Sequence, residues 1–202
     1  MYQAKKEPRR KNDFYPTPDG VPLACLRVAV PDLFKGYCSV MDVGAGLGIW
    51  GQAISYNAPA VTLTGVEVNP EFPATTCYDT WHVGNYLHLD YELITERYDY
   101  VVGNPPFNIA EDCIRNGLKS LRKGGKLTFL LRLAYLESLG RGNGLFKEFP
   151  PLTVHVSSRR IPFESYDGTS ASKVPFAMFT WEQGRTQGDT VIKWFDWKED
   201  KG

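Results

Sequence analysis

The chain has 202 residues and balanced charge, with 23 lysines and arginines against 23 aspartates and glutamates. Its length predicts a single domain that can bury a hydrophobic core. No apolar run approaches membrane-spanning length, and the polar, basic N-terminus predicts no signal peptide. Four widely spaced cysteines without a CxxC pair predict reduced thiols in a cytoplasmic protein, with no metal site and no disulfide framework.

The first segment, residues 1–11, concentrates positive charge although the whole chain has none in excess. We expect a flexible basic arm, which is either a solvated tail or a contact for phosphates. Residues 21–34 then place apolar side chains at helical spacing, interrupted by Pro31.

Residues 40–48 read as a buried strand that enters a glycine-rich turn, followed by a helix from about residue 49 to residue 56. Asp42 ends the apolar run, and Gly44 and Gly46 allow positive φ and close approach of a ligand to the backbone. A second strand over residues 62–68 contains Glu67, about 25 residues after Asp42. An acidic residue at that distance commonly binds a ribose diol.

The rest of the chain alternates strands with helical stretches, which predicts an α/β fold with a mostly parallel sheet covered by helices on both faces. We expect a helix over residues 110–121, stopped by Gly124 and Gly125. Short strands are expected near residues 82–83, before Gly103, and over residues 126–131, 150–157 and 177–181. Residues 191–197 are either an edge strand or a tail.

The most informative motif is Asn104-Pro105-Pro106-Phe107, directly after an apolar run. The prolines make the turn rigid. We expect the Asn104 side chain and the Pro105 carbonyl to offer two acceptors in one cleft, beside the stacking ring of Phe107. This combination suits a planar substrate that carries an NH2 group, and adenine fits that description.

Together these motifs resemble an S-adenosylmethionine-dependent N6-adenine methyltransferase, and more narrowly the small phage-type Dam family of DNA methyltransferases. Residues 12–18 resemble the family's N-terminal cofactor segment, and residues 84–86 its adenine-binding turn. Residues 158–163, 167–168 and 176–181 resemble its C-terminal signature. The resemblance implies a Rossmann-like class I fold with an antiparallel C-terminal strand, DNA as partner and the bacterial cytoplasm as location.

The resemblance also implies roles for residues in the N-terminal segment and in the adenine-binding turn. Phe14 and Tyr15 would line the cofactor pocket, and Thr17 would bond near the methionine carboxylate. Tyr86 would pack on the cofactor's adenine ring, while Asn85 would hydrogen-bond the edge of that ring. Many relatives carry Asp where this chain has Asn85.

The residues that hold DNA are less marked. A separate target-recognition domain is not expected in a chain of this length, so two segments, residues 132–149 and 159–173, are candidate loops. Arg132, Arg159 and Arg160 could contact phosphates or guanine edges there.

Three alternatives stay open. Asn-Pro-Pro-aromatic turns also occur in RNA adenine methyltransferases and in enzymes that methylate a glutamine amide of release factors. The chain could also be a catalytically silent module that binds nucleic acid. The glutamine enzymes usually carry an additional N-terminal helical domain, which we do not expect in a chain of this length.

Overall fold

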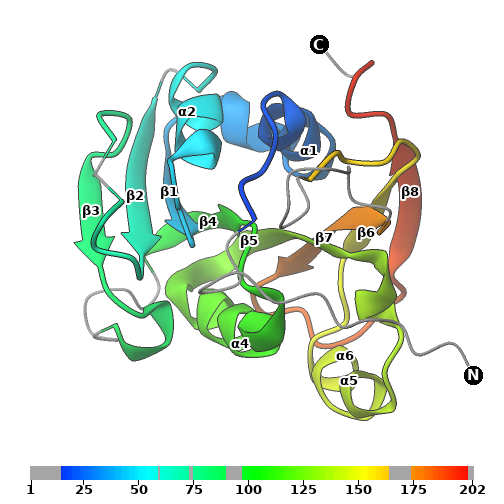
Figure 1. The fold of residues 1–202 in the computed structure, drawn as a ribbon. Coiled ribbons are helices and arrows are strands. Elements are labelled where there is room, and N and C mark those ends of the chain that lie inside the picture. The colour runs from blue at the N-terminus through cyan, green and yellow to red at the C-terminus, as the bar shows by residue number, and fades with distance from the viewer. Residues whose placement is uncertain (1–14, 59, 73–74, 90–96, 164–173, 200–202) are drawn as a thin grey trace, which may run out of the picture.

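The structure is a computed structural model and describes residues 15–58, 60–72, 75–89, 97–163 and 174–199. Eight strands form one sheet in the order β3-β2-β1-β4-β5-β7-β6-β8 (Figure 1). The five strands from β3 to β5 are parallel, whereas β7 runs antiparallel to both β5 and β6. The predicted α/β fold with a mostly parallel sheet is therefore confirmed, and the antiparallel strand in its C-terminal part is β7 and not the last strand, β8.

The elements follow the predicted order along the chain. The strands are β1 Cys38–Val43, β2 Val61–Glu67, β3 Thr80–Val83, β4 Tyr98–Gly103, β5 Leu121–Arg132, β6 Thr153–Ser157, β7 Phe176–Glu182 and β8 Val191–Phe195. The α-helices are α1 Val21–Ala29, α2 Ile49–Ser55, α4 Ala110–Ser120, α5 Leu139–Asn143 and α6 Leu145–Glu148, with 3₁₀ turns at Pro31–Phe34, Tyr86–His88, Phe107–Ile109 and Leu133–Leu136. None of the helices among the described residues has the length and apolarity needed to cross a bilayer.

Two hydrophobic cores lie on opposite faces of the sheet. Helices α1 and α2 cover one face, where Leu26 and Ile54 pack with Val40 of β1. Helix α4 covers the other face, where Ile114 packs with Met41 of the same strand (Figure 1). Consecutive strand residues point to opposite faces, so β1 is buried along its whole length.

The sheet brings three chain segments to one edge. In the parallel register Val43 pairs with Val66 of β2 on one side and with Gly103 of β4 on the other. The glycine-rich turn, Glu67 and Asn104 therefore lie side by side at the ends of three neighbouring strands. This is the carboxyl edge, where ligands bind in open α/β sheets.

Two predictions about local structure were wrong. Helix α4 has the predicted bounds within one residue, but Gly124 and Gly125 do not stop it: the chain turns to extended geometry at Leu121, and both glycines lie within β5. The candidate loop over residues 132–149 folds into a 3₁₀ turn and the short helices α5 and α6. The other candidate loop is described only up to Phe163, where it has no regular element.

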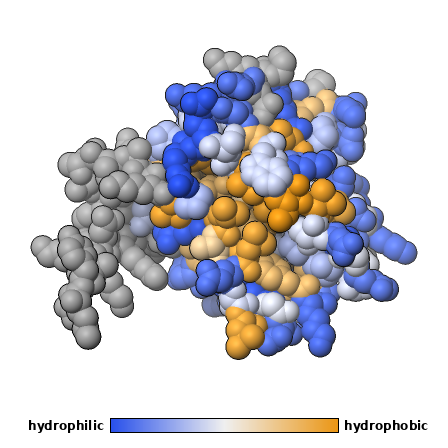
Figure 2. Space-filling view, turned by 90° about the vertical axis from the view of Figure 1, so that its right-hand side faces the viewer, coloured by the Kyte–Doolittle hydropathy of each residue, from blue (hydrophilic) through white to orange (hydrophobic). Residues whose placement is uncertain are grey.

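The C-terminal segment is an edge strand, because β8 pairs in parallel with β6 and ends the sheet. Val191, Ile192 and Trp194 are 49%, 48% and 70% exposed on it. Figure 2 views this side of the molecule and shows apolar surface gathered in the middle of the face. Exposed edges of this kind are open to pairing with other strands.

Candidate functional site

A cavity of about 200 Å³ opens at the carboxyl edge of the sheet, above β2, β1 and β4. It brings together seven of the predicted site residues, which come from segments far apart in the chain: Tyr15, Thr17, Gly44, Gly46, Glu67, Asn104 and Pro106. The remaining wall is mostly apolar and includes Ile49, Val68 and Phe72. A concave, largely apolar cavity with a few convergent polar groups is the usual form of a ligand site.

The floor of the cavity is the glycine-rich turn between β1 and α2. Gly44 and Gly46 have φ values of 71° and 54°, which glycine adopts at little cost. The backbone N–H groups of Gly44 and Ala45 both donate to the Val66 carbonyl at 3.0 Å. A β-carbon at Gly44 would lie 3.9 Å from the Asn104 carbonyl oxygen, so the turn and the Asn104 segment are close neighbours.

Glu67 lies at the end of β2 and is only 5% exposed. Its Oε2 accepts a hydrogen bond from the Gly46 N–H at 2.8 Å, and its Oε1 accepts one from the Asn69 N–H at 2.8 Å. A carboxylate has about four lone-pair sites, so each oxygen retains capacity for a second donor. Glu67 can therefore hold the glycine turn and still accept two hydroxyl groups from a ligand.

Asn104 has an amide whose two ends are in different environments. Its Nδ2 donates to the Tyr15 carbonyl and to the Thr17 hydroxyl, both at 3.2 Å. Its Oδ1 is buried and has no hydrogen-bond partner among the described residues. A buried acceptor without a partner is costly. The amide is thus held by its donors and leaves its acceptor for a ligand.

Phe107, one turn further on, belongs to a group of rings. Tyr15 stacks on it with a centroid distance of 6.2 Å, and Phe176 of β7 lies at 5.9 Å. The Arg132 guanidinium carbon lies 4.5 Å from the centroid of the Phe107 ring, in cation–π geometry. Phe107 therefore has aromatic and cationic neighbours at the place where a base was expected to stack. Pro105, between Asn104 and Pro106, is buried and does not line the cavity.

Asp42 lies beneath the cavity rather than in its wall. It is fully buried, and its Oδ2 accepts a hydrogen bond from the Tyr78 hydroxyl at 2.6 Å. Burial raises the pKa of Asp42 to about 7, the Tyr78 hydrogen bond lowers it, and the charge of Glu67 raises it. Asp42 is therefore a buried partner of Tyr78 and does not line the cavity.

The predicted adenine-binding turn also lies outside the cavity wall. Asn85 is exposed, and its Oδ1 accepts from the Leu87 N–H at 3.0 Å as the N-cap of a 3₁₀ turn. Tyr86 is 6% exposed and packs in the core beneath α4, with its hydroxyl 3.5 Å from Ser120 Oγ. A ring packed in the core cannot stack on a ligand without moving. Phe14 lies outside the described residues.

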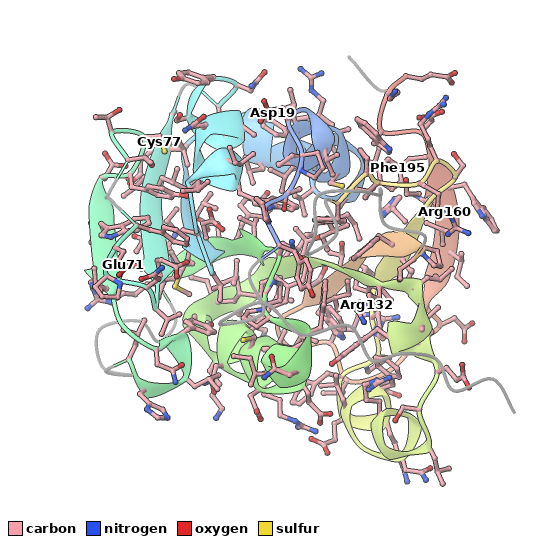
Figure 3. All side chains as sticks on the ribbon, viewed as in Figure 1. Asp19, Glu71, Cys77, Arg132, Arg160 and Phe195 are labelled. Carbon is pink, nitrogen blue, oxygen red and sulfur yellow. The ribbon has the colours of Figure 1, made fainter. Side chains whose placement is uncertain are left out.

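The three predicted arginines have different surroundings. Arg159 forms a double hydrogen bond with Asp196, with a closest distance of 2.6 Å, so its charge is neutralised within the chain. Arg160 is exposed and lies beside β8, away from Arg132 (Figure 3). Arg132 ends β5, and among the described residues it has no carboxylate partner. Only Arg132 of the three adjoins a ring of the candidate site.

Several residues of the site were not predicted. Trp50 of α2 lines the cavity and donates through Nε1 to the Thr17 hydroxyl at 3.1 Å. Asn69 and Phe72 follow Glu67 and form the opposite wall. Sequence position could have indicated these residues, because Trp50 comes directly after the glycine turn and Asn69 and Phe72 come shortly after Glu67. No group of three His, Cys, Asp or Glu residues suited to a metal ion occurs in the described part of the chain.

Comparison with known proteins identifies the family. The family model of the methyltransferase small domain matches residues 27–137, more than half of the chain. The chain belongs to this methyltransferase family. The match spans the glycine turn, Glu67 and Asn104, which are the segments that meet at the cavity. The cofactor of this methyltransferase is S-adenosylmethionine, and the positive-φ glycines, the cavity-lining Glu67 carboxylate and the apolar wall fit it.

Curated relatives of this methyltransferase are named ribosomal RNA small subunit methyltransferase C. The protein of that name from Serratia proteamaculans (strain 568) is 35% identical over 100 residues, which cover 44% of this chain and 29% of the relative. Other matches with the same name cover 29% to 42% of the relative. The chain therefore spans less than half the length of the curated relatives it matches.

Solved structures share the fold at low identity. The type I restriction-modification system methyltransferase subunit from Streptococcus thermophilus has a TM-score of 0.67 at 17% identity, covering 89% of this chain and 47% of that one. A TehB-like SAM-dependent methyltransferase from Corynebacterium glutamicum has a TM-score of 0.55 at 15% identity, covering 82% and 88%. These likenesses concern the fold alone.

Proposed function

We propose that this methyltransferase transfers the methyl group of S-adenosylmethionine to an exocyclic amino group of a base in RNA. The observation that carries the proposal is the Asn104 amide, whose Nδ2 is held by Tyr15 and Thr17 while its buried Oδ1 has no described partner. The names of the curated relatives favour RNA as the polymer.

Glu67, Gly44 and Gly46 would hold the cofactor, with Glu67 accepting hydrogen bonds from its ribose hydroxyls. When bound, S-adenosylmethionine supplies an electrophilic methyl group on a positively charged sulfur. The side chain of Asn104 is neutral, so it adds no charge that would trap the sulfonium. The apolar wall residues Ile49 and Phe72 would limit the access of water to the bound cofactor.

The chemical task of the protein is to make a weak nucleophile reactive. The lone pair of a base amino group is delocalised into the ring. Asn104 Oδ1 and the Pro105 carbonyl would each accept one hydrogen of that amino group, which favours a pyramidal nitrogen with its lone pair freed. Phe107 would stack on the base. The nitrogen gains a methyl group and releases one proton to water, so catalysis rests on positioning and electrostatic complementarity.

A second candidate is the N6 position of adenine in DNA. It is favoured by the resemblance of residues 12–18, 104–107 and 158–163 to DNA adenine methyltransferases. In duplex DNA the target adenine would have to leave the stack to reach Asn104. Of the motif-bearing segments, residues 12–14 lie outside the described residues.

The deciding experiment compares polymers with one enzyme. Matched RNA and DNA, both from a host without base methylation, are incubated with radiolabelled S-adenosylmethionine, and the products are digested to nucleosides and identified. We expect methylated base amino groups from RNA and little product from DNA. Product from DNA alone would support the second candidate, and product from neither polymer would contradict both.

The same assay tests the residue that carries the proposal. Asn104→Ala removes one preorganised hydrogen-bond partner, which typically lowers turnover about 100- to 1000-fold. Binding of S-adenosylhomocysteine, measured by calorimetry, should change little, because the proposed role of Asn104 is to hold the substrate. Parental turnover in Asn104→Ala would remove the motif from the active site.

A further inference from the structure

A chain of hydrogen bonds links the helix after the glycine turn to Asn104. Trp50 of α2 is 3% exposed, and its Nε1 donates to Thr17 Oγ1 at 3.1 Å. The same Thr17 oxygen accepts from Asn104 Nδ2 at 3.2 Å, and Thr17 is 7% exposed. Three buried or partly buried side chains thus meet at one hydroxyl oxygen, although Thr17 and Asn104 are 87 residues apart in sequence.

Counting donors and acceptors shows what this arrangement does. A hydroxyl oxygen has two lone pairs, and here both are taken, one by Trp50 and one by Asn104. The indole N–H can only donate a hydrogen bond, so Trp50 must be the donor and Thr17 the acceptor. The rotation of the Thr17 side chain is therefore restricted, and its lone pair stays directed at the Asn104 amide.

The Tyr15 carbonyl determines the orientation of the Asn104 side-chain amide. A carbonyl oxygen accepts hydrogen bonds and cannot donate them, and it receives Asn104 Nδ2 at 3.2 Å. A flipped amide would bring Oδ1 against this carbonyl, acceptor against acceptor. With both Nδ2 hydrogens used by Tyr15 and Thr17, Oδ1 is left as a buried acceptor without a described partner.

We propose that Thr17, held by Trp50, is a positioning residue that orients the Asn104 amide so that Oδ1 meets the amino group of the target base. This proposal rests on the proposed function, and it assigns Thr17 a task different from binding the methionine carboxylate. Both acceptor positions of the Thr17 hydroxyl oxygen serve Asn104 and Trp50.

The test uses four variants of the full chain. Thr17→Val keeps the shape of the side chain and removes the hydroxyl, whereas Thr17→Ser restores the hydroxyl. Trp50→Phe removes the indole donor. The matched control is Thr62→Val. The Thr62 hydroxyl also bonds an aromatic side chain, Tyr37 Oη at 3.0 Å, but Thr62 lies at the start of β2, whereas the cavity adjoins Glu67 at the end of that strand.

Two readouts separate positioning from cofactor binding. Turnover at saturating cofactor should fall about 10- to 100-fold in Thr17→Val, as expected when a reacting group is misplaced, and Thr17→Ser should recover most of it. Affinity for S-adenosylhomocysteine, measured by calorimetry, should stay near that of the parent. We expect Trp50→Phe to lower turnover less than Thr17→Val, since the hydroxyl remains, and Thr62→Val to match the parent.

A third readout does not depend on the substrate. In ¹⁵N-labelled protein the side-chain amide signal of Asn104, assigned with Asn104→Asp, should shift in Thr17→Val and return toward its parental position in Thr17→Ser. If the parent methylates no nucleic acid, the proposed function fails, while this signal still reports on the Thr17 contact. An unmoved Asn104 signal, or a loss of turnover that follows a loss of cofactor affinity, would overturn the positioning role.

Discussion

Glu67 is placed so that one side chain can combine structural contacts with ligand binding. Its two oxygens already accept the N–H groups of Gly46 and Asn69, and we expect the remaining lone pairs to accept the ribose hydroxyls of the cofactor. A charge-assisted hydrogen bond contributes more than a neutral one. The carboxylate is therefore the polar group to which cofactor affinity should be most sensitive.

We expect Glu67→Ala to weaken cofactor binding by roughly 2–4 kcal/mol, because two hydrogen bonds to a charged group are lost and water compensates in part. Glu71→Ala removes the same charge from an exposed position (Figure 3) next to Phe72, which lines the cavity, and serves as the control. Calorimetry with S-adenosylhomocysteine measures both. Equal affinities of the two variants would remove Glu67 from the site.

Asp42 gives the stability of the protein a defined pH dependence. Burial first, and the charge of Glu67 as a smaller cause, raise its pKa to about 7 against the Tyr78 hydrogen bond. The folded state thus holds the carboxyl proton of Asp42 more tightly than the unfolded chain, in which an aspartate has a pKa of about 3.9. Asp42 therefore destabilises the fold progressively as pH rises from about 4 to about 7, and to a constant extent above that.

Asp42→Asn should remove this part of the pH dependence, since the amide stays neutral and can still accept from the Tyr78 hydroxyl. We expect the stability of the variant relative to the parent to be greater at pH 8 than at pH 5. Urea unfolding at the two pH values, without cofactor, measures the difference. The same relative stability at both values would mean that Asp42 does not titrate in this range.

At the scale of elements, the end of β4 determines where Asn104 lies. Gly103 has a φ of 144°, and a β-carbon there would lie 2.5 Å from the Val43 carbonyl oxygen of β1. The backbones of the two strands thus approach each other closely just before the rigid proline turn. A side chain at Gly103 would push β4 away from β1 and displace the turn that follows.

Gly103→Ala should therefore destabilise the protein by about 1–3 kcal/mol from backbone strain alone, with an added cost from the clash. Gly142→Ala is the matched control, because a β-carbon at that position in α5 meets nothing within 4 Å. There the same change should be neutral or stabilise by up to about 1 kcal/mol. Chemical unfolding measures the change in stability of both variants. Similar changes in the two would contradict the close approach of β1 and β4.

At the scale of the whole molecule, the proposed binding of nucleic acid would have to come from local charge, since basic and acidic residues balance at 23 each. Arg132 adjoins the Phe107 ring and has no described carboxylate partner, whereas Arg159 is paired with Asp196. Both candidates carry the same formal charge. Of these two, Arg132 is the one that can exchange its present contact for a phosphate without breaking an ion pair.

Arg132→Ala should weaken binding to a single-stranded oligonucleotide and reduce the slope of log affinity against log salt concentration by about 0.7, the value for one phosphate contact. Arg159→Ala removes the same charge and should leave the slope nearly unchanged. Fluorescence anisotropy at several salt concentrations measures both. Equal slopes for the two variants would show that Arg132 contacts no phosphate.

The sequence by itself determined the order of the strands and of α1, α2 and α4, the turn after β1 and the turn after β4. These features depend on local properties: apolar runs, glycines that allow positive φ, and prolines that fix it. Glu67 could be predicted as well, because its distance from Asp42 follows from the length of one helix and one strand. The end of α4 was predicted within one residue, but for the wrong reason: β5 begins at Leu121 and pairs with β4, so the helix has already ended before Gly124 and Gly125.

Only the tertiary structure decided the partners of the site residues. Thr17 reaches Asn104 across 87 residues, and Tyr78 reaches Asp42 across 36. Sequence spacing carries no information about such contacts, because they depend on how α1, α2 and the loop after β2 pack over the sheet. For the same reason the sequence could not show that Asp196 neutralises Arg159 or that Tyr86 lies in the core. Local chemistry selects which residues can act, and long-range packing selects which of them meet.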